Sequence, residues 1–165
     1  HTHSKSTTQH QMQMYNELSK QLQREVPKPG KKSNLVNTLH EIAERIQRRS
    51  LVVIFSDMLD NADHSVDDIF GALQHLKHNK HELVLFHVYD KATEYDFKFD
   101  NAPKRFVDVE SGAAVDVHPE ALQQSYEAAI EAYFKDLRTT CGQYKINYVG
   151  VDIKEGFDKL LTAFW

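Results

Sequence analysis

The chain has 165 residues and a mass of 19.1 kDa, with 41% hydrophobic and 27% charged residues, which is the composition of one ordinary globular domain. The formal net charge of -4 and the lack of a basic stretch in the sequence argue against nucleic acid as a partner. The only cysteine, Cys141, excludes a disulfide framework and a cysteine-based zinc site. It favours a reducing compartment, so we expect a cytoplasmic protein, and no apolar run approaches the roughly 18 residues of a membrane span.

The first fifty residues predict a polar arm and two helices. Residues 1–9 offer nothing to bury and are expected to be a loop or disordered arm. Apolar residues at helical spacing predict a helix over residues 10–23, which prolines and a glycine in residues 26–30 end. Ser33 is placed to cap a second helix through its hydroxyl oxygen. The buried stripe of that helix consists of Leu35, Leu39, Ile42 and Ile46.

The middle of the chain predicts a strand, a helix and a strand. Residues 51–55 are apolar without alternation, which is typical of a parallel strand covered on both faces near the middle of a sheet. A helix with an apolar face follows and runs to about Asn79. Residues 83–90 repeat the pattern of the first strand, so the three elements form a βαβ unit.

The last third predicts a small insertion and a return to the sheet. Residues 91–118 are expected to form an antiparallel insertion, in which residues 95–100 alternate as a strand does. Pro119 is suited to begin a long helix, for which Gly142 is the expected C-cap. Residues 146–152 form a third parallel strand, and residues 154–164 a last helix.

The expected fold class is α/β: a doubly wound, mainly parallel, Rossmann-like sheet with three parallel strands and a small antiparallel insertion, in one domain of residues 1–165. No strand precedes residues 51–55 to cover the outer edge of what reads as a central strand, so we expect a partial domain. That edge should be covered by a segment absent from this sequence, by another chain, or by the polar residues before His10.

Polar side chains follow the first strand directly. Ser56, Asp57 and Asp60 come at its carboxyl end, where the ligands of open α/β sheets bind. Ser56 and Asp60 are therefore candidate contacts for a ligand or partner, and Asp57 is the first candidate for a metal ligand. The alternative for each acid is that it hydrogen-bonds its own turn.

Four segments carry a resemblance to a known family: residues 48–57, residues 88–90 with Glu94, residues 106–112, and residues 141–151. They closely resemble the carboxyl-terminal half of a large bacterial family of unknown function. Its members carry a von Willebrand factor A-like domain and are typically encoded beside MoxR-class AAA+ ATPases. The Asp-Val-Glu-Ser-Gly turn is the most specific part of the match.

The resemblance implies a role for Asp57 as the later acid of a metal-ion-dependent adhesion site. It places Ser33 where that site usually offers a threonine, although helix capping alone also explains Ser33. Mg²⁺ prefers about six oxygen ligands, often including water, and is the metal expected in the full-length parent. The Asp-x-Ser-x-Ser motif of the adhesion site does not occur in this sequence. We therefore expect weak or no metal binding by this chain alone.

The histidines invite a zinc hypothesis, because His75 and His78 are three residues apart and His81 follows. Zinc needs three or four converging ligands, and no cysteine or glutamate signature accompanies them, so we favour a solvated helix end. His87, inside the second strand, is expected to be a hydrogen-bonded core residue, and Cys141 to be part of the core.

The leading hypothesis is a non-enzymatic protein-interaction module, metal-assisted in the full-length parent, with a MoxR-class ATPase as the partner that the resemblance suggests. No nucleophile elbow, phosphate-binding glycine loop or dinucleotide motif is present in the sequence. Two alternatives stay open. One is a receiver-like phosphoacceptor domain that uses Asp57, and the other is a structural domain whose metal site has decayed.

Overall fold

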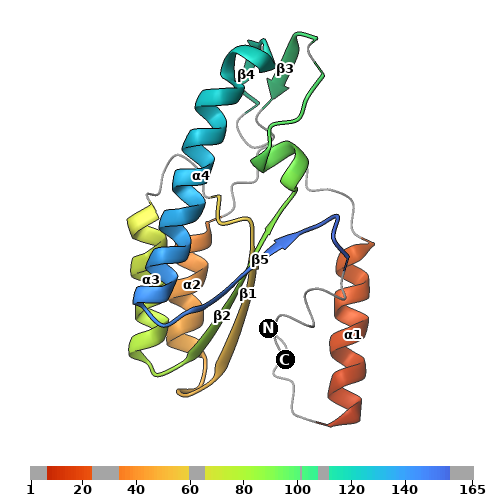
Figure 1. Ribbon diagram of the computed structural model, residues 1–165. Helices are drawn as coiled ribbons and strands as arrows, with labels where there is room; N and C mark the ends of the chain where they lie inside the picture. Colours follow the sequence, from red (N-terminus) through yellow and green to blue (C-terminus); the bar gives the residue numbers. More distant parts are fainter. Residues whose placement is uncertain (1–6, 24–33, 60–65, 101, 108–111, 157–165) are drawn as a thin grey trace.

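The structure is a computed structural model that describes residues 7–23, 34–59, 66–100, 102–107 and 112–156 (Figure 1). Ser33, Asp60 and the predicted arm up to residue 6 lie outside the described residues, as does most of the predicted last helix. The elements follow one another as α1 (Thr8–Leu22), α2 (Leu35–Arg45), β1 (Leu51–Ser56), α3 (Val66–His78), β2 (Glu82–Tyr89), the π-helix η1 (Lys91–Tyr95), β3 (Lys104–Val107), β4 (Ala114–Val117), α4 (Pro119–Gln143) and β5 (Asn147–Asp152).

The described strands form two sheets. The larger has the order β1-β2-β5 with both pairs parallel, and Phe55 lies opposite Phe86, which lies opposite Val149. The smaller is the antiparallel pair of β3 and β4. The predicted fold class is confirmed by this combination of three parallel strands with a small antiparallel sheet.

A single apolar core lies between the parallel sheet and three helices. In Figure 1 α2, α3 and α4 stand together on one side of the sheet. Because β2 is the central strand, its residues of both parities are buried, as the sequence predicted for this strand. The core includes Leu39 of α2, Leu73 and Leu76 of α3, Leu85 of β2, and Leu137 and Cys141 of α4.

The first strand departs from its prediction. β1 pairs with β2 alone among the described strands, so it is an edge strand and not a central one. Its exposure alternates, and Leu51, Val53 and Phe55 are 55%, 44% and 62% exposed. The expectation of a strand near the middle of a sheet with both faces covered is therefore not met among the described residues, whereas the expectation that no strand of this chain lies beyond its outer edge agrees with the order β1-β2-β5. An apolar run indicates that a strand favours burial, but it does not indicate which segment or chain packs against it.

The helix that precedes this sheet does not contribute to the core. α1 has apolar residues at helical spacing, as predicted, yet none of its residues is buried. In Figure 1 it stands on the opposite side of the sheet from α2 and α3. Its apolar side chains are exposed, including Met12, Tyr15, Leu18 and Leu22.

The insertion differs from the prediction in its first part. The expected strand at residues 95–100 is absent from the described structure, where η1 and a turn take its place. Phe97 has a left-handed backbone, with φ of 47°, and its ring lies 4.5 Å from that of Tyr126 and 5.9 Å from that of Phe106. Clustering of these rings on α4 and β3 outweighs the local strand pattern, because aromatic contacts bury large apolar areas.

The residues that begin helix α2 and end helix α4 lie one to three positions from the residues predicted as caps. Asn34 caps α2, because its side-chain oxygen accepts a hydrogen bond of 2.8 Å from the backbone N–H of Asn37. α4 continues past Gly142 to Gln143 and ends through Lys145, which takes the left-handed conformation (φ of 54°) that glycine would adopt without strain.

Candidate functional site

The turn after β1 holds the predicted contact residues of this strand. The hydroxyl oxygen of Ser56 accepts a hydrogen bond of 3.0 Å from the N–H of Met58, and Oδ1 of Asp57 accepts one of 3.2 Å from the N–H of Leu59. Met58 has a left-handed backbone and is 1% exposed. Both polar side chains therefore accept hydrogen bonds within their own turn, which for Asp57 is the alternative that the sequence left open.

The same arrangement occurs at the ends of the other two parallel strands. Oδ1 of Asp90 accepts from the N–H of Ala92 at 3.0 Å, and Oδ1 of Asp152 accepts from the N–H of Lys154 at 3.1 Å. All three acids bond the N–H two residues further on, which defines an Asx turn. The acidic residue that ends each strand is thus explained by local backbone hydrogen bonding.

A buried histidine holds the turn of β1 from the core side. The side chain of His87, 0% exposed, donates from Nε2 to the carbonyl oxygen of Asp57 at 3.0 Å and accepts at Nδ1 from the hydroxyl of Tyr148 at 2.8 Å. Burial lowers the pKa of His87, so the neutral ring is favoured. Tyr133 donates from its hydroxyl to the carbonyl oxygen of Met58. The prediction of a hydrogen-bonded core histidine is confirmed.

Charges at this edge are largely neutralised by neighbours. Lys154 beside Asp90, at 2.8 Å, lowers the pKa of that carboxyl. Lys91 and Lys98 lower the pKa of Asp96 in the same way, through contacts of 2.6 and 2.7 Å. Burial raises the pKa of Glu94, and the carboxylates of Asp57 and Asp90 add to this effect. Among the described residues the carboxyl edge is therefore a network of turns and ion pairs.

The described residues do not form a complete magnesium site. Within the described ranges no group of three or more His, Cys, Asp or Glu side chains is placed to hold a metal ion. Asp57 lines an open pocket of about 480 Å³ with Phe55, Ser56 and Val88, and one of its carboxylate oxygens already accepts a hydrogen bond. One carboxylate and one hydroxyl fall short of the oxygen set that Mg²⁺ requires. Ser33 and Asp60 are outside the described residues.

The three histidines of the zinc hypothesis do not share a ligand position. Nδ1 of His75 lies 3.1 Å from Nδ1 of His40, and His81 is buried with Nδ1 accepting from the N–H of Ser50 at 3.1 Å. His78 lines a separate pocket at the opposite edge of the sheet. The zinc hypothesis therefore has no support among the described residues.

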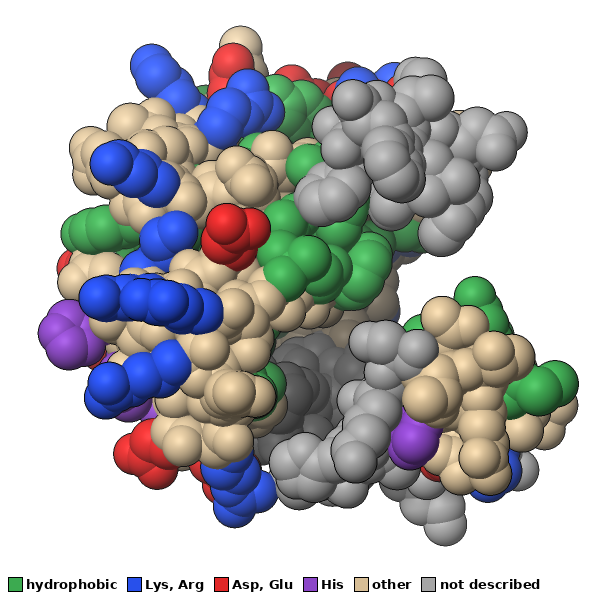
Figure 2. All heavy atoms as spheres, turned by 90° about the horizontal axis from the view of Figure 1, so that it is seen from below, with side chains coloured by type: hydrophobic (Ala, Val, Ile, Leu, Met, Phe, Trp, Pro, Cys, Tyr) green, Lys and Arg blue, Asp and Glu red, His purple; other side chains and the backbone are tan. Residues whose placement is uncertain are grey.

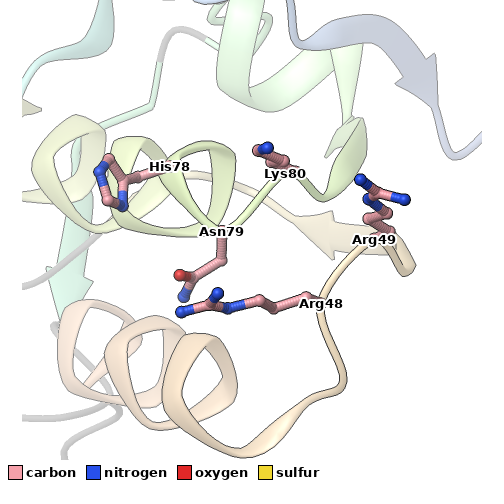
Figure 3. A pocket seen from close by; sticks show the side chains of 5 residues that line it. All are labelled: Arg48, Arg49, His78, Asn79 and Lys80. Carbon is pink, nitrogen blue, oxygen red and sulfur yellow. The ribbon is translucent and has the colours of Figure 1, made fainter.

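That pocket is one the sequence interpretation missed. It measures about 450 Å³ and is lined by Arg48, Arg49, His78, Asn79 and Lys80 (Figure 3). Figure 2, which views this end of the molecule, shows Lys and Arg side chains gathered on one side of it. The register of the sheet explains the pocket: Arg49 and Lys80 each precede by two residues the register partners Leu51 and Glu82, so parallel pairing places both cations at the same edge.

These observations define a mixed α/β domain with a parallel sheet and a cationic pocket at the amino ends of its strands. The family model of DUF58, a family of proteins of unknown function, matches residues 2–135, and the chain belongs to this family. No curated protein and no solved structure matches the chain. Among the described helices there is none whose length and apolar character would allow it to cross a membrane.

Proposed function

We propose that the chain is a non-enzymatic protein-interaction module that binds a strand of a partner protein along the outer edge of β1. The observation that supports this most strongly is the exposure of Leu51, Val53 and Phe55, at 55%, 44% and 62%. Strands of parallel sheets are normally covered on both faces, and proteins usually protect their edge strands. A strand that meets neither condition among the described residues is suited to association.

The chemistry of β1 favours an extended apolar segment as the occupant. Exposed side chains recur at every second residue, which matches the repeat of a strand added beside it. Phe55 stacks on Phe86 with ring centroids 4.8 Å apart, so the exposed ring is held in place before binding. Strand addition would pair the outer backbone groups of β1, and neighbouring apolar side chains would provide specificity.

The partner that we propose is a MoxR-class AAA+ ATPase, on the strength of the family resemblance of residues 48–57 and 106–112. Metal assistance in a full-length parent would draw most of its oxygen ligands from outside the described residues, since Asp57 supplies one carboxylate that also holds a turn. The hydrogen bond that the Asp57 carboxylate accepts from the N–H of Leu59 also weighs against Asp57 as a phosphoacceptor.

The experiment measures binding of the chain to a MoxR-class ATPase by biolayer interferometry. Val53→Lys places a charge in the exposed row and should weaken binding by about tenfold or more, because a desolvated unpaired charge is costly at an interface. Val115→Lys is the matched control, since Val115 is also a strand valine, 60% exposed, in the antiparallel sheet. Unchanged binding with Val53→Lys, or equal loss with Val115→Lys, would contradict the proposal.

Two further measurements separate the alternatives. Binding that is the same with Mg²⁺ and with a chelator would remove metal assistance. Incubation with acetyl phosphate should give no added phosphate mass, whereas an adduct that Asp57→Ala abolishes would establish the phosphoacceptor function instead.

A further inference from the structure

The pocket at the amino edge of the sheet is lined by cations, and there is no carboxylate among its described lining residues. Arg48 and Arg49 lie between α2 and β1, His78 is the last residue of α3, and Asn79 and Lys80 lie between α3 and β2. In Figure 3, Arg48 extends toward Asn79, while Arg49 and Lys80 stand on the turns that lead into the two strands. Three permanent positive charges thus surround one cavity in a chain whose formal net charge is -4.

Hydrogen bonds between the two turns fix the walls of this pocket. The N–H of Glu82 donates to the carbonyl oxygen of Ser50 at 3.0 Å, and the N–H of Ser50 donates to Nδ1 of His81 at 3.1 Å. The side-chain amide of Asn79 donates to the carbonyl oxygen of Ala43 at 3.0 Å, which ties the end of α3 to the end of α2. The charged residues therefore stand on a framework that exists before any ligand binds.

These cations lack the partners that other lysines of the chain possess. Among the described residues no ion pair includes Arg48, Arg49 or Lys80, whereas Lys91, Lys98 and Lys154 are each paired with an aspartate. The carbonyl ends of α2 and α3 attract cations to this edge, and this accounts for some of the positive charge. It does not account for the backbone of Arg49 and Lys80, both of which have φ of 63°.

A left-handed backbone is an unfavourable choice for a side chain other than glycine. Each such residue costs about 1 kcal/mol relative to the right-handed conformation. Glycine would form either turn without that cost. Lys145 ends α4 outside the pocket with a similar φ of 54°, so the backbone conformation alone does not assign a ligand. The support for a ligand is that Arg48, Arg49 and Lys80 line one pocket without an ion pair among the described residues.

We propose that this pocket binds the phosphoryl group of a small phosphorylated molecule, a function separate from the interaction at β1. Arginine guanidinium groups match phosphate oxygens through paired N–H donors, and lysine adds a compact charge. The volume of about 450 Å³ is within the range of small-molecule sites. A half-open pocket with cations on several sides suits a compact anion better than an extended one.

The test uses the whole chain and inorganic pyrophosphate as the probe, by isothermal titration calorimetry at fixed ionic strength, because exposed charges are screened by salt. The unaltered chain should bind pyrophosphate with a saturable one-site isotherm. Arg49→Ala should weaken binding about tenfold or more, since it removes a charge-assisted pair of hydrogen bonds. Arg105→Ala is the matched control, because Arg105 is an exposed arginine of β3 and should leave the affinity unchanged.

Arg49→Gly tests whether a loss of binding is caused by unfolding. Glycine relieves the left-handed backbone strain, so this variant should unfold at a temperature no lower than that of the unaltered chain. It should nevertheless bind pyrophosphate as weakly as Arg49→Ala. Val53→Lys should bind pyrophosphate normally, so that failure of the β1 interface and failure of this site are distinguishable. Four results would each overturn the proposal: no saturable binding, equal loss with Arg105→Ala, equal affinity for malonate, or binding to phosphatidic acid vesicles but not to free pyrophosphate.

Discussion

The carboxyl and amino edges of the parallel sheet carry side chains of opposite charge. These side chains also differ in whether they have a hydrogen-bond or ion-pair partner among the described residues. At the carboxyl edge, Asp57, Asp90 and Asp152 each accept a hydrogen bond from the backbone N–H two residues on. At the amino edge, Arg48, Arg49 and Lys80 line a pocket and have no ion pair among the described residues. The aspartates each take part in a turn, whereas the cations line the pocket in which we propose that a ligand binds.

The difference shows that position at the end of a strand is a weak indicator of function until the hydrogen bonds of the side chain are known. An aspartate after a strand is favoured both where a ligand binds and where a tight turn must be closed. Three cations at one end of the sheet that line a pocket without an ion pair among the described residues have no comparable local explanation. The following predictions test the contrast, beginning with the largest effect.

The strongest test of the carboxyl edge as a structural network is His87→Leu. The substitution removes the partly buried hydrogen bonds of His87 to the carbonyl oxygen of Asp57 and to the hydroxyl of Tyr148, which should cost about 3 kcal/mol of unfolding free energy. Urea unfolding measures this, and Tyr148→Phe, which removes one hydroxyl, should cost about 1 kcal/mol. A loss below that of Tyr148→Phe would show that the network contributes little.

Acidification should weaken the same network by a smaller amount. Burial holds the pKa of His87 in the folded chain below its ordinary value of 6.5, so the unfolded chain binds the proton more readily. The contribution of His87 is therefore complete above pH 6.5 and is lost as the pH falls from 6.5 toward the lower folded pKa. Urea midpoints at pH 7.5 and 5.5 should differ more for the unaltered chain than for His87→Leu, and equal differences would contradict the assignment.

Substitution of Asp57 distinguishes a turn from a metal site. Asp57→Asn keeps an oxygen that can accept from the N–H of Leu59, whereas Asp57→Ala removes it and should cost about 1 kcal/mol. Thermal unfolding with and without Mg²⁺ measures both variants. Suppose that Asp57→Asn lowered the unfolding temperature as much as Asp57→Ala, and only when Mg²⁺ was present. The charge of the carboxylate would then be needed to bind the metal, and the conclusion that Asp57 serves only its turn would be wrong.

The smallest expected effect is a gain in unfolding free energy, whereas the preceding substitutions should lower it. Arg49→Gly should raise the unfolding free energy by about 0.5 kcal/mol, because relief of the left-handed strain slightly exceeds the entropy cost of glycine. Lys145→Gly, at φ of 54° and outside the pocket, should give a similar gain without any effect on pyrophosphate binding. A loss of stability in Arg49→Gly alone would mean that the arginine serves the fold and not a ligand.

The elements of the sheet could be predicted because their signals are local. Residues 83–90 are apolar on both parities and form the buried central strand, and the spacing of Leu73 and Leu76 matches the buried face of α3. The strand predicted at residues 95–100 failed because Phe97 and Phe99 pack with Phe106 and Tyr126, partners distant in the sequence. Local alternation cannot report such contacts.

The candidate functional residues were also predicted only in part. The sequence identified Ser56 and Asp57 and stated the turn as an alternative, since both possibilities depend on the same few residues. It could not bring Arg49 and Lys80 together, because 31 positions separate them and only the parallel register of β1 and β2 makes them neighbours.

By itself the sequence determined the α/β class, the three parallel strands with the helices between them and part of the core, because periodicity and apolar runs indicate which side chains favour burial. The tertiary structure alone decided that one face of β1 is exposed among the described residues, that the aspartates at the strand ends accept hydrogen bonds in turns, and that the cations at the opposite ends of the strands share a pocket. These depend on strand order and register, which are set by contacts between distant segments.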